Sequence, residues 1–226
     1  MNTPAAQPIT IHLDDGSAVS GLLLTPARST CAFVFAHGAG AGMQHAFMSA
    51  FASGLAERGV ATLRYQFPYM EKGSKRPDSP KVAHAAVRAA VAEGTRRWPG
   101  MPLVAGGKSF GARMTSQAQA VSALPGVVGL AFVGFPLHPA GKPSADRADH
   151  LSNVRVPMLF LQGTRDELAD LTLLEPVTQR LKPLATVQLF DDADHSFHVR
   201  ARSGQTDAQV MAAMLDAFVA WADTLV

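Results

Sequence analysis

The amino-acid sequence predicts an α/β fold: a mostly parallel β-sheet that begins with an antiparallel hairpin and carries helices on both faces. Near the N-terminus, two short segments of alternating apolar residues flank a turn signal. Apolar runs of strand length then alternate with helical patterns along the rest of the chain. No repeat, low-complexity segment or domain boundary interrupts this alternation. We therefore expect one domain over residues 1–226.

Each element of this fold has its own signal. The hairpin is expected over residues 9–13 and 19–24, around a turn at Asp14, Asp15 and Gly16. Apolar runs predict strands at residues 31–36, 60–65, 102–105, 127–133 and 156–161, with a weaker strand at 186–190. Apolar residues at helical spacing predict helices at residues 46–58, 79–98, 113–122, 171–181 and 207–224.

Two segments between these elements are informative. Residues 71–80, rich in Lys, Ser, Pro and Gly, predict a surface loop that could fold over a site. Residues 134–155, between two expected strands, are too few to form a helical cap domain. A site in this protein should therefore be open to solvent.

Composition narrows the class of protein. With 226 residues, 47% of them hydrophobic and 17% charged, the chain is typical of a globular domain. A formal charge of +2 with scattered Lys and Arg does not favour a nucleic-acid partner. Cys31, alone in the sequence, cannot form an intrachain disulfide. Residues 1–15 lack the features of a secretory signal, and no apolar run has the length of a membrane span. We expect a reduced, cytoplasmic setting without a membrane partner, and the oligomeric state stays open.

Four motifs follow expected strands, which is where ligands bind in sheets of this kind. The first, at residues 107–111, fits the pattern G-x-S-x-G between a strand and a helix, with Ser109 on a sharp turn. Gly107 and Gly111 are needed because a Cβ there would collide with the turn or the adjoining strand. The motif predicts Ser109 as a nucleophile; the alternative is a glycine-rich turn whose serine caps the next helix.

The second motif supplies a carboxylate. Asp166 follows the strand expected at 156–161, where it could accept a hydrogen bond from a histidine and hold its tautomer. Glu167 and Asp170 compete for this role, or they cap and decorate the helix that follows. Asp166 is the predicted acid.

The third motif supplies a base. His195 follows the weak last strand and could take the proton of Ser109, since an alcohol is a poor nucleophile without an adjacent base. His198 competes with it as a neighbour in the same loop. The prediction is His195.

The fourth motif is the glycine-rich loop at residues 37–42. Gly38 allows the backbone to approach a substrate, and we expect the amides of Ala39 and Phe110 to form an oxyanion hole. The glycine spacing does not fit a dinucleotide fingerprint, and the P-loop pattern does not follow it. His37 is expected to support the loop by a hydrogen bond, not to act as a second base.

Taken together, these motifs resemble the α/β-hydrolase superfamily over essentially the whole chain. Residues 64–73 and 106–109 resemble a small, lid-less dienelactone-hydrolase-like group within it. This group includes the testis-expressed and chromatin-complex-associated hydrolase-like proteins. Dienelactone hydrolases have a cysteine nucleophile, whereas position 109 here is serine. The resemblance implies the α/β-hydrolase fold without a cap domain, but not dienelactone cleavage itself.

The resemblance also implies a mechanism. Ser109 would attack a carbonyl, His195 would move the proton, Asp166 would orient His195, and the two amides would stabilise the oxyanion. The implied substrate is a small carboxylic ester or thioester, and no metal or cofactor is implied. Two other functions fit the same features: a non-catalytic interaction module that retains the fold, and an acyltransferase or perhydrolase with the same triad.

Side chains near these motifs suggest the substrate wall. Tyr65, Phe67 and Tyr69 are expected to line one side of the site together with Gly38, or else simply to pack the loop. Lys108 directly precedes Ser109, but a side chain at that position is expected to point away from the nucleophile. We assign Lys108 no chemistry from the sequence.

Overall fold

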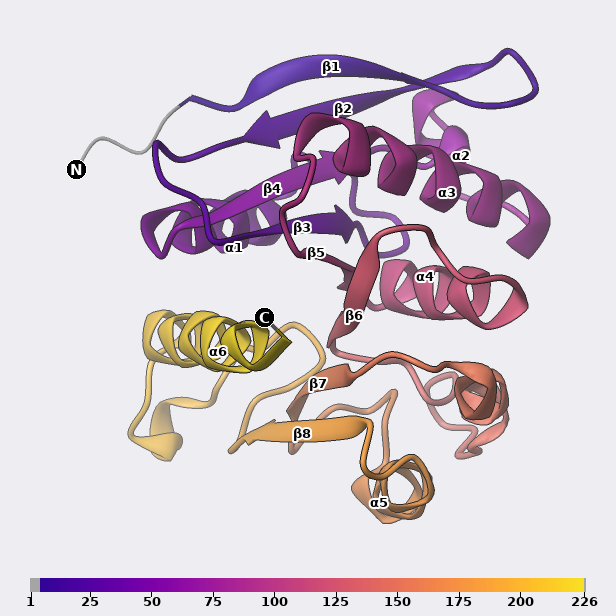
Figure 1. Cartoon of the computed structure of the whole chain (residues 1–226). Coiled ribbons are helices and arrows are strands. Elements are labelled where there is room, and N and C mark those ends of the chain that lie inside the picture. The colour runs from indigo at the N-terminus through magenta and orange to yellow at the C-terminus, as the bar shows by residue number, and fades with distance from the viewer. Residues whose placement is uncertain (1–4, 226) are drawn as a thin grey trace.

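A single eight-stranded sheet forms the centre of the molecule in the computed structural model, which describes residues 5–225 (Figure 1). Residues 1–4 and 226, the ends of the expected domain and part of the segment searched for a signal, lie outside the described residues. The strand order is β1-β2-β4-β3-β5-β6-β7-β8. β1 pairs antiparallel with β2 and β2 antiparallel with β4, whereas the other neighbours are parallel. The predicted fold class is confirmed.

The strands and helices have the following bounds. The strands are β1 (Gln7–His12), β2 (Ala18–Leu24), β3 (Cys31–Ala36), β4 (Val60–Tyr65), β5 (Leu103–Lys108), β6 (Val127–Val133), β7 (Met158–Gly163) and β8 (Ala185–Phe190). The α-helices are α1 (Ala46–Glu57), α2 (Pro68–Glu71), α3 (Pro80–Arg97), α4 (Phe110–Val121), α5 (Leu171–Arg180) and α6 (Asp207–Ala222). Short 3-10 helices are η1 (Asp146–Asn153), η2 (Ala201–Ser203) and η3 (Asp223–Leu225).

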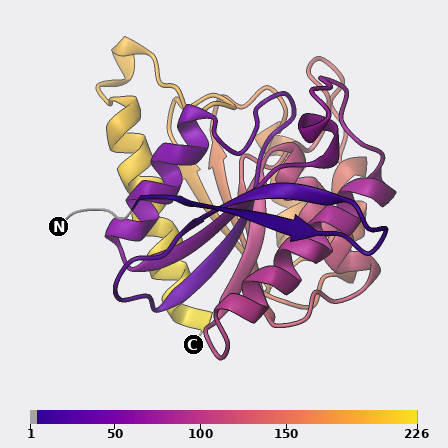
Figure 2. The ribbon, with the colours of Figure 1, turned by 90° about the horizontal axis from the view of Figure 1, so that it is seen from above.

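Helices cover both faces of the sheet. α1 and α6 lie on one face, and α3, α4 and α5 lie on the other (Figures 1 and 2). On the first face, Phe51 of α1 and Phe218 of α6 pack against the aromatic rings of β3. On the second, Val87 and Met114 belong to a separate buried cluster. Because both faces are covered, every residue of β3 and β4 is buried, which explains the continuous apolar run of β3.

The region around Ser109 differs from the expected boundaries. β5 extends past the expected end at residue 105 to Lys108, and α4 begins at Phe110 instead of residue 113. The glycines at 106 and 107 suggested a turn, but they are needed in the strand for close packing. A Cβ on Gly107 would lie 2.5 Å from the carbonyl oxygen of Ala36 on β3. Ser109 alone therefore connects strand and helix.

Three short helices, α2, η1 and η2, have no counterpart in the predicted elements. α2 and η1 are too short, or too polar, to show a helical period in the sequence. Between β6 and β7, the described chain contains η1 and loops, with no helical cap over the sheet. The expected loop at residues 71–80 is mostly exposed, and α3 begins at its last residue, Pro80.

Among residues 5–225 no helix combines the length and the apolar character that crossing a membrane requires.

Candidate active site

Ser109 lies on a strained turn between β5 and α4. Its φ of 51° and ψ of −111° are values that a side-chain-bearing residue rarely adopts. Gly107 and Gly111 flank it, and a Cβ on either would lie 2.5 Å from the carbonyl oxygen of Ala36. The close approach of β3 thus fixes the turn and leaves Ser109 partly exposed at the N-terminus of α4. The aligned amides of that terminus favour negative charge beside Ser109.

The structure brings Ser109, His195 and Asp166 together in one hydrogen-bonded chain. Nε2 of His195 lies 2.8 Å from Oγ of Ser109, and Nδ1 lies 2.7 Å from Oδ2 of Asp166. A carboxylate only accepts hydrogen bonds, so Nδ1–H donates to Asp166 and the neutral ring presents Nε2 as the acceptor for the hydroxyl of Ser109. This arrangement can take a proton from the serine as its oxygen attacks a carbonyl.

Asp166 is held in place by groups other than His195. Nε2 of Gln162 donates to Oδ2 at 2.5 Å, and the amide of Leu168 donates to Oδ1 at 2.8 Å. Gln162 is itself fixed, because its Oε1 accepts a hydrogen bond from the amide of Phe135 at 3.0 Å. The side chain of Asp166 is 1% exposed, so its orientation toward His195 is set by the protein and not by solvent.

The competing acidic and basic residues have other partners. Asp170 caps α5 by accepting a hydrogen bond from the amide of Thr172, and Glu167 is exposed. His198 pairs with Asp207 at the start of α6, with Nδ1 at 2.9 Å from Oδ2. None of the three takes part in the hydrogen-bonded chain to Ser109.

The two expected oxyanion donors lie on either side of Ser109. The amide of Phe110 is the first of α4, where a helix provides no backbone acceptor. The amide of Ala39 makes no hydrogen bond to any other described residue, and Ala39 lines the pocket that contains Ser109. Both N–H groups are therefore available to a ligand, and their role as an oxyanion hole stays a prediction.

His37 stabilises the loop that carries Ala39. Nε2 of His37 accepts a hydrogen bond from the amide of Phe67 at 3.0 Å, and Nδ1–H donates to the carbonyl of Gly38 at 2.8 Å. Burial lowers the pKa of His37 to about 4, which keeps the ring neutral. His37 thus has the supporting contacts that the sequence suggested.

The pocket above Ser109 has a volume of about 380 Å³. Gly38 lines it, as expected, together with His195 and the apolar side chains of Phe47, Met48 and Leu168. The expected aromatic wall does not form. Tyr65, Phe67 and Tyr69 are at most 3% exposed and belong to the buried core. An aromatic residue type alone does not indicate whether a side chain faces the pocket or the core.

Two polar residues near the triad had no predicted role. Gln162 is buried near the end of β7. The signal available in the sequence was an amide side chain directly after the strand expected at residues 156–161. Lys108 reaches under the loop of His195, where its Nζ donates to the carbonyl oxygen of His195 at 2.5 Å. No sequence pattern indicated this contact, because it joins the end of β5 to the distant loop after β8. The expectation that Lys108 points away from the nucleophile was wrong, since Lys108 lines the same pocket as Ser109.

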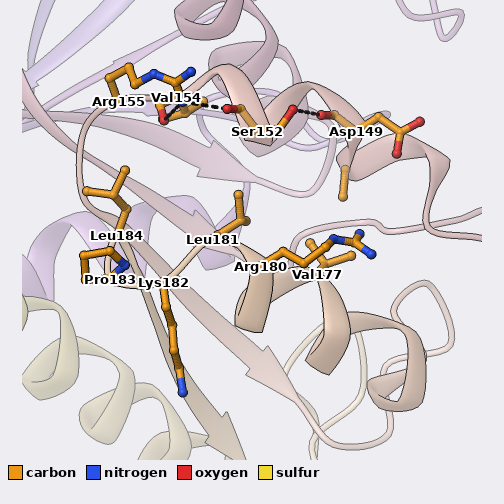
Figure 3. Close-up of a pocket in the computed structure, with 11 residues that line it drawn as sticks. Asp149, Ser152, Val154, Arg155, Val177, Arg180, Leu181, Lys182, Pro183 and Leu184 are labelled. Carbon is orange, nitrogen blue, oxygen red and sulfur yellow. Dashed lines mark hydrogen bonds between the residues drawn. The ribbon is translucent and has the colours of Figure 1, made fainter.

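A larger pocket, of about 640 Å³, lies away from the triad (Figure 3). Its residues precede β7 and β8, so it opens at the amino ends of these strands, opposite the end that carries Ser109. In Figure 3, the side chains of Arg180 and Lys182 extend in different directions and do not converge on one point. The pocket at Ser109 is therefore the better candidate site.

No group of three or more His, Cys, Asp or Glu side chains among residues 5–225 is arranged to hold a metal ion.

Comparisons with known proteins agree with this fold. A lid-less α/β serine hydrolase from Xanthomonas campestris matches with a TM-score of 0.75 at 20% identity, covering 98% of this chain and 97% of that one. A dienelactone hydrolase from Anabaena variabilis matches with a TM-score of 0.76 at 18% identity, over 96% and 98% of the two chains. An esterase domain from Rhodothermus marinus has a TM-score of 0.72 at 17% identity, over 97% and 98%.

At these identities the structures establish a shared fold. The family is established separately by a sequence profile described as an alpha/beta hydrolase domain, which matches residues 29–223. This match spans every element from β3 to α6 and so includes Ser109, Asp166 and His195. The finer resemblance to the testis-expressed and chromatin-associated proteins stays a prediction. The chain belongs to the alpha/beta hydrolase domain family, with the lid-less architecture of its structural neighbours.

Proposed function

We propose that this hydrolase is a serine esterase that cleaves a small carboxylic ester or thioester through an acyl-enzyme intermediate. The observation that carries the proposal is the position of His195, which bridges Ser109 and Asp166 at 2.8 and 2.7 Å. The strained backbone of Ser109 supports it, because such strain is common at nucleophiles that must be exposed.

The reaction follows from these groups. Oγ of Ser109 attacks the carbonyl carbon while Nε2 of His195 takes its proton, and the amides of Ala39 and Phe110 stabilise the oxyanion. The imidazolium then protonates the leaving alcohol or thiol, and the acyl group remains on Ser109. Water, deprotonated by His195, attacks this ester and releases the acid. Asp166 stabilises the imidazolium in both steps.

The size and surroundings of the pocket support a small acyl group. A volume of about 380 Å³ walled by Phe47, Met48 and Leu168 suits a short aliphatic chain. No cap covers it in the described chain, so a long lipid chain would find little further surface to bury. The proposed substrate is thus a small acyl compound of the cytoplasm.

Hydrolysis of p-nitrophenyl acetate and butyrate by the parent protein and by Ser109→Ala tests the proposal. Loss of the nucleophile of such a triad lowers kcat by about 10⁶-fold, so only background hydrolysis should remain in the variant. Equal rates in both proteins would rule out Ser109 as the nucleophile. Added alcohol or peroxide as a competing acceptor separates a hydrolase from an acyltransferase or a perhydrolase.

A further inference from the structure

The side chain of Lys108 lies beneath the loop that carries His195. It extends from the last residue of β5, directly before Ser109, and its ammonium lies beside the stacked rings of Phe47 and Phe197. Nζ is 5.8 Å from the ring centre of Phe47 and 5.4 Å from that of Phe197. These contacts stabilise a cation that has few polar neighbours.

The ammonium satisfies an otherwise unpaired carbonyl. The oxygen of His195 accepts no backbone hydrogen bond from another described residue, because it lies inside a turn closed by the Phe197 amide on the carbonyl of Asp194. Nζ of Lys108 donates to it at 2.5 Å. An acceptor left unpaired in this position would be costly, so the contact holds the loop in place.

We propose that Lys108 is a positioning residue that fixes the main chain of His195, and with it the imidazole, relative to Ser109. Because Lys108 and Ser109 are adjacent in the chain, this bond ties the base directly to the strand that carries the nucleophile. It is independent of the hydrogen bonds within the triad. The inference rests on the proposed function and assigns a role to a residue outside the triad.

The charge of Lys108 strengthens this contact. Burial lowers the pKa of Lys108 to about 8, although the carboxylates of Asp166 and Asp194 act in the opposite direction, so the side chain is charged at neutral pH. A hydrogen bond from a charged donor is stronger than one between two neutral groups.

Lys108→Met tests the proposal, because methionine keeps an unbranched side chain that packs against aromatic rings but removes the donor and the charge. We expect kcat for p-nitrophenyl acetate to fall about 10- to 100-fold, as for a misplaced catalytic group, with KM nearly unchanged. Hydrogen exchange measured by NMR should be faster at the amide of Phe197, which closes the turn that contains His195, because that turn loses its contact with β5. Lys108→Arg, which restores a cation and donors, should recover part of kcat and part of the protection of this amide.

Lys142→Met is the matched control, since it removes an exposed lysine of the loop that follows β6. It should leave kcat and the hydrogen exchange of the Phe197 amide unchanged. A folded Lys108→Met with the kcat and the Phe197 exchange rate of the parent would overturn the proposal. If Lys108→Met does not fold, a Lys108→Arg protein with the catalytic defect and the fast Phe197 exchange expected of Met would overturn it equally. An inert parent would instead contradict the proposed function, while the hydrogen exchange would still decide the role of Lys108.

Discussion

At the scale of single residues, the hydrogen bonds of the site determine which polar atom donates and which accepts. Asp166 accepts from Gln162, from the amide of Leu168 and from His195. Because the carboxylate is buried and surrounded by donors, it stays oriented without solvent. The tautomer of His195 follows from this, since Nδ1–H must face Asp166. Ser109 then has an acceptor for its proton.

Asp166→Asn should impair catalysis with little effect on substrate binding. The amide can donate to Nδ1 and so favours the wrong tautomer of His195. We expect kcat for p-nitrophenyl acetate to fall about 10³- to 10⁴-fold with KM nearly unchanged. Asp170→Asn, at the cap of α5, is the control and should keep the parent rate. A loss of rate in Asp170→Asn and not in Asp166→Asn would assign the acid to Asp170.

At the scale of elements, the contact between β3 and α4 places Ser109. Gly111 in the first turn of α4 lies against Ala36, the last residue of β3, with no room for a side chain between them. This contact brings the start of α4 down onto the sheet and leaves one residue for the turn. The strain at Ser109 is thus a consequence of packing at its neighbours.

Gly111→Ala should destabilise the protein, although alanine is normally the better helix former. Its Cβ would lie 2.5 Å from the carbonyl oxygen of Ala36, so strand and helix must separate, at a cost of about 1–3 kcal/mol. Urea unfolding followed by circular dichroism measures the loss. Val121→Ala in the same helix, at a side chain 75% exposed, should leave stability unchanged. An unaltered unfolding midpoint in Gly111→Ala would show that this contact does not constrain α4.

The same elements show how far the sequence predicts the fold. The strands at residues 31–36, 60–65 and 127–133 agree with the structure, because burial on both faces favours apolar residues along most of their length, although the strand at 60–65 also contains Thr62 and Arg64. The predicted end of β5 was wrong, because the sequence does not distinguish glycines that allow close packing from glycines that form turns. The contacts of Lys108 and Gln162 join distant segments, so no local pattern predicts them.

At the scale of the whole molecule, the sheet topology gathers the site. Ser109 follows β5, Asp166 follows β7 and His195 follows β8, while the loop with Ala39 follows β3. These four strands are parallel, so their carboxyl ends meet at one edge of the sheet. The order of the motifs along the chain allowed the grouping of these side chains to be predicted, and their catalytic roles stay a prediction. The order of the motifs does not predict the burial of the aromatic residues at 65, 67 and 69, since their burial depends on the packing of the entire core.

Stability should depend on pH through buried neutral histidines. Burial lowers the pKa of His37 from 6.5 to about 4, and burial together with nearby cations lowers that of His150 to about 4. At pH values between 4 and 6.5 the unfolded chain binds protons that the folded chain does not. The free energy of unfolding therefore falls as pH falls from 6.5 toward 4. At pH 5 each such histidine lowers the free energy of unfolding by about 2 kcal/mol relative to neutral pH.

Urea unfolding at pH 7 and pH 5 checks this dependence. His37→Gln should lose less stability than the parent between the two pH values, since its side chain does not titrate. His12→Gln, at an exposed position, should lose as much as the parent. A parent and a His37→Gln protein with the same loss would assign the pH dependence to other groups.

The most direct measurement of the central claim is the mass of the protein after exposure to a fluorophosphonate, with the modified residue mapped by peptide sequencing. Such probes react with serines that an adjacent base activates, and the chain from Asp166 through His195 activates Ser109. The account predicts one adduct, on Ser109, that is absent from Ser109→Ala. A parent protein that stays unmodified, or an adduct on another residue with Ser109 free, would contradict it.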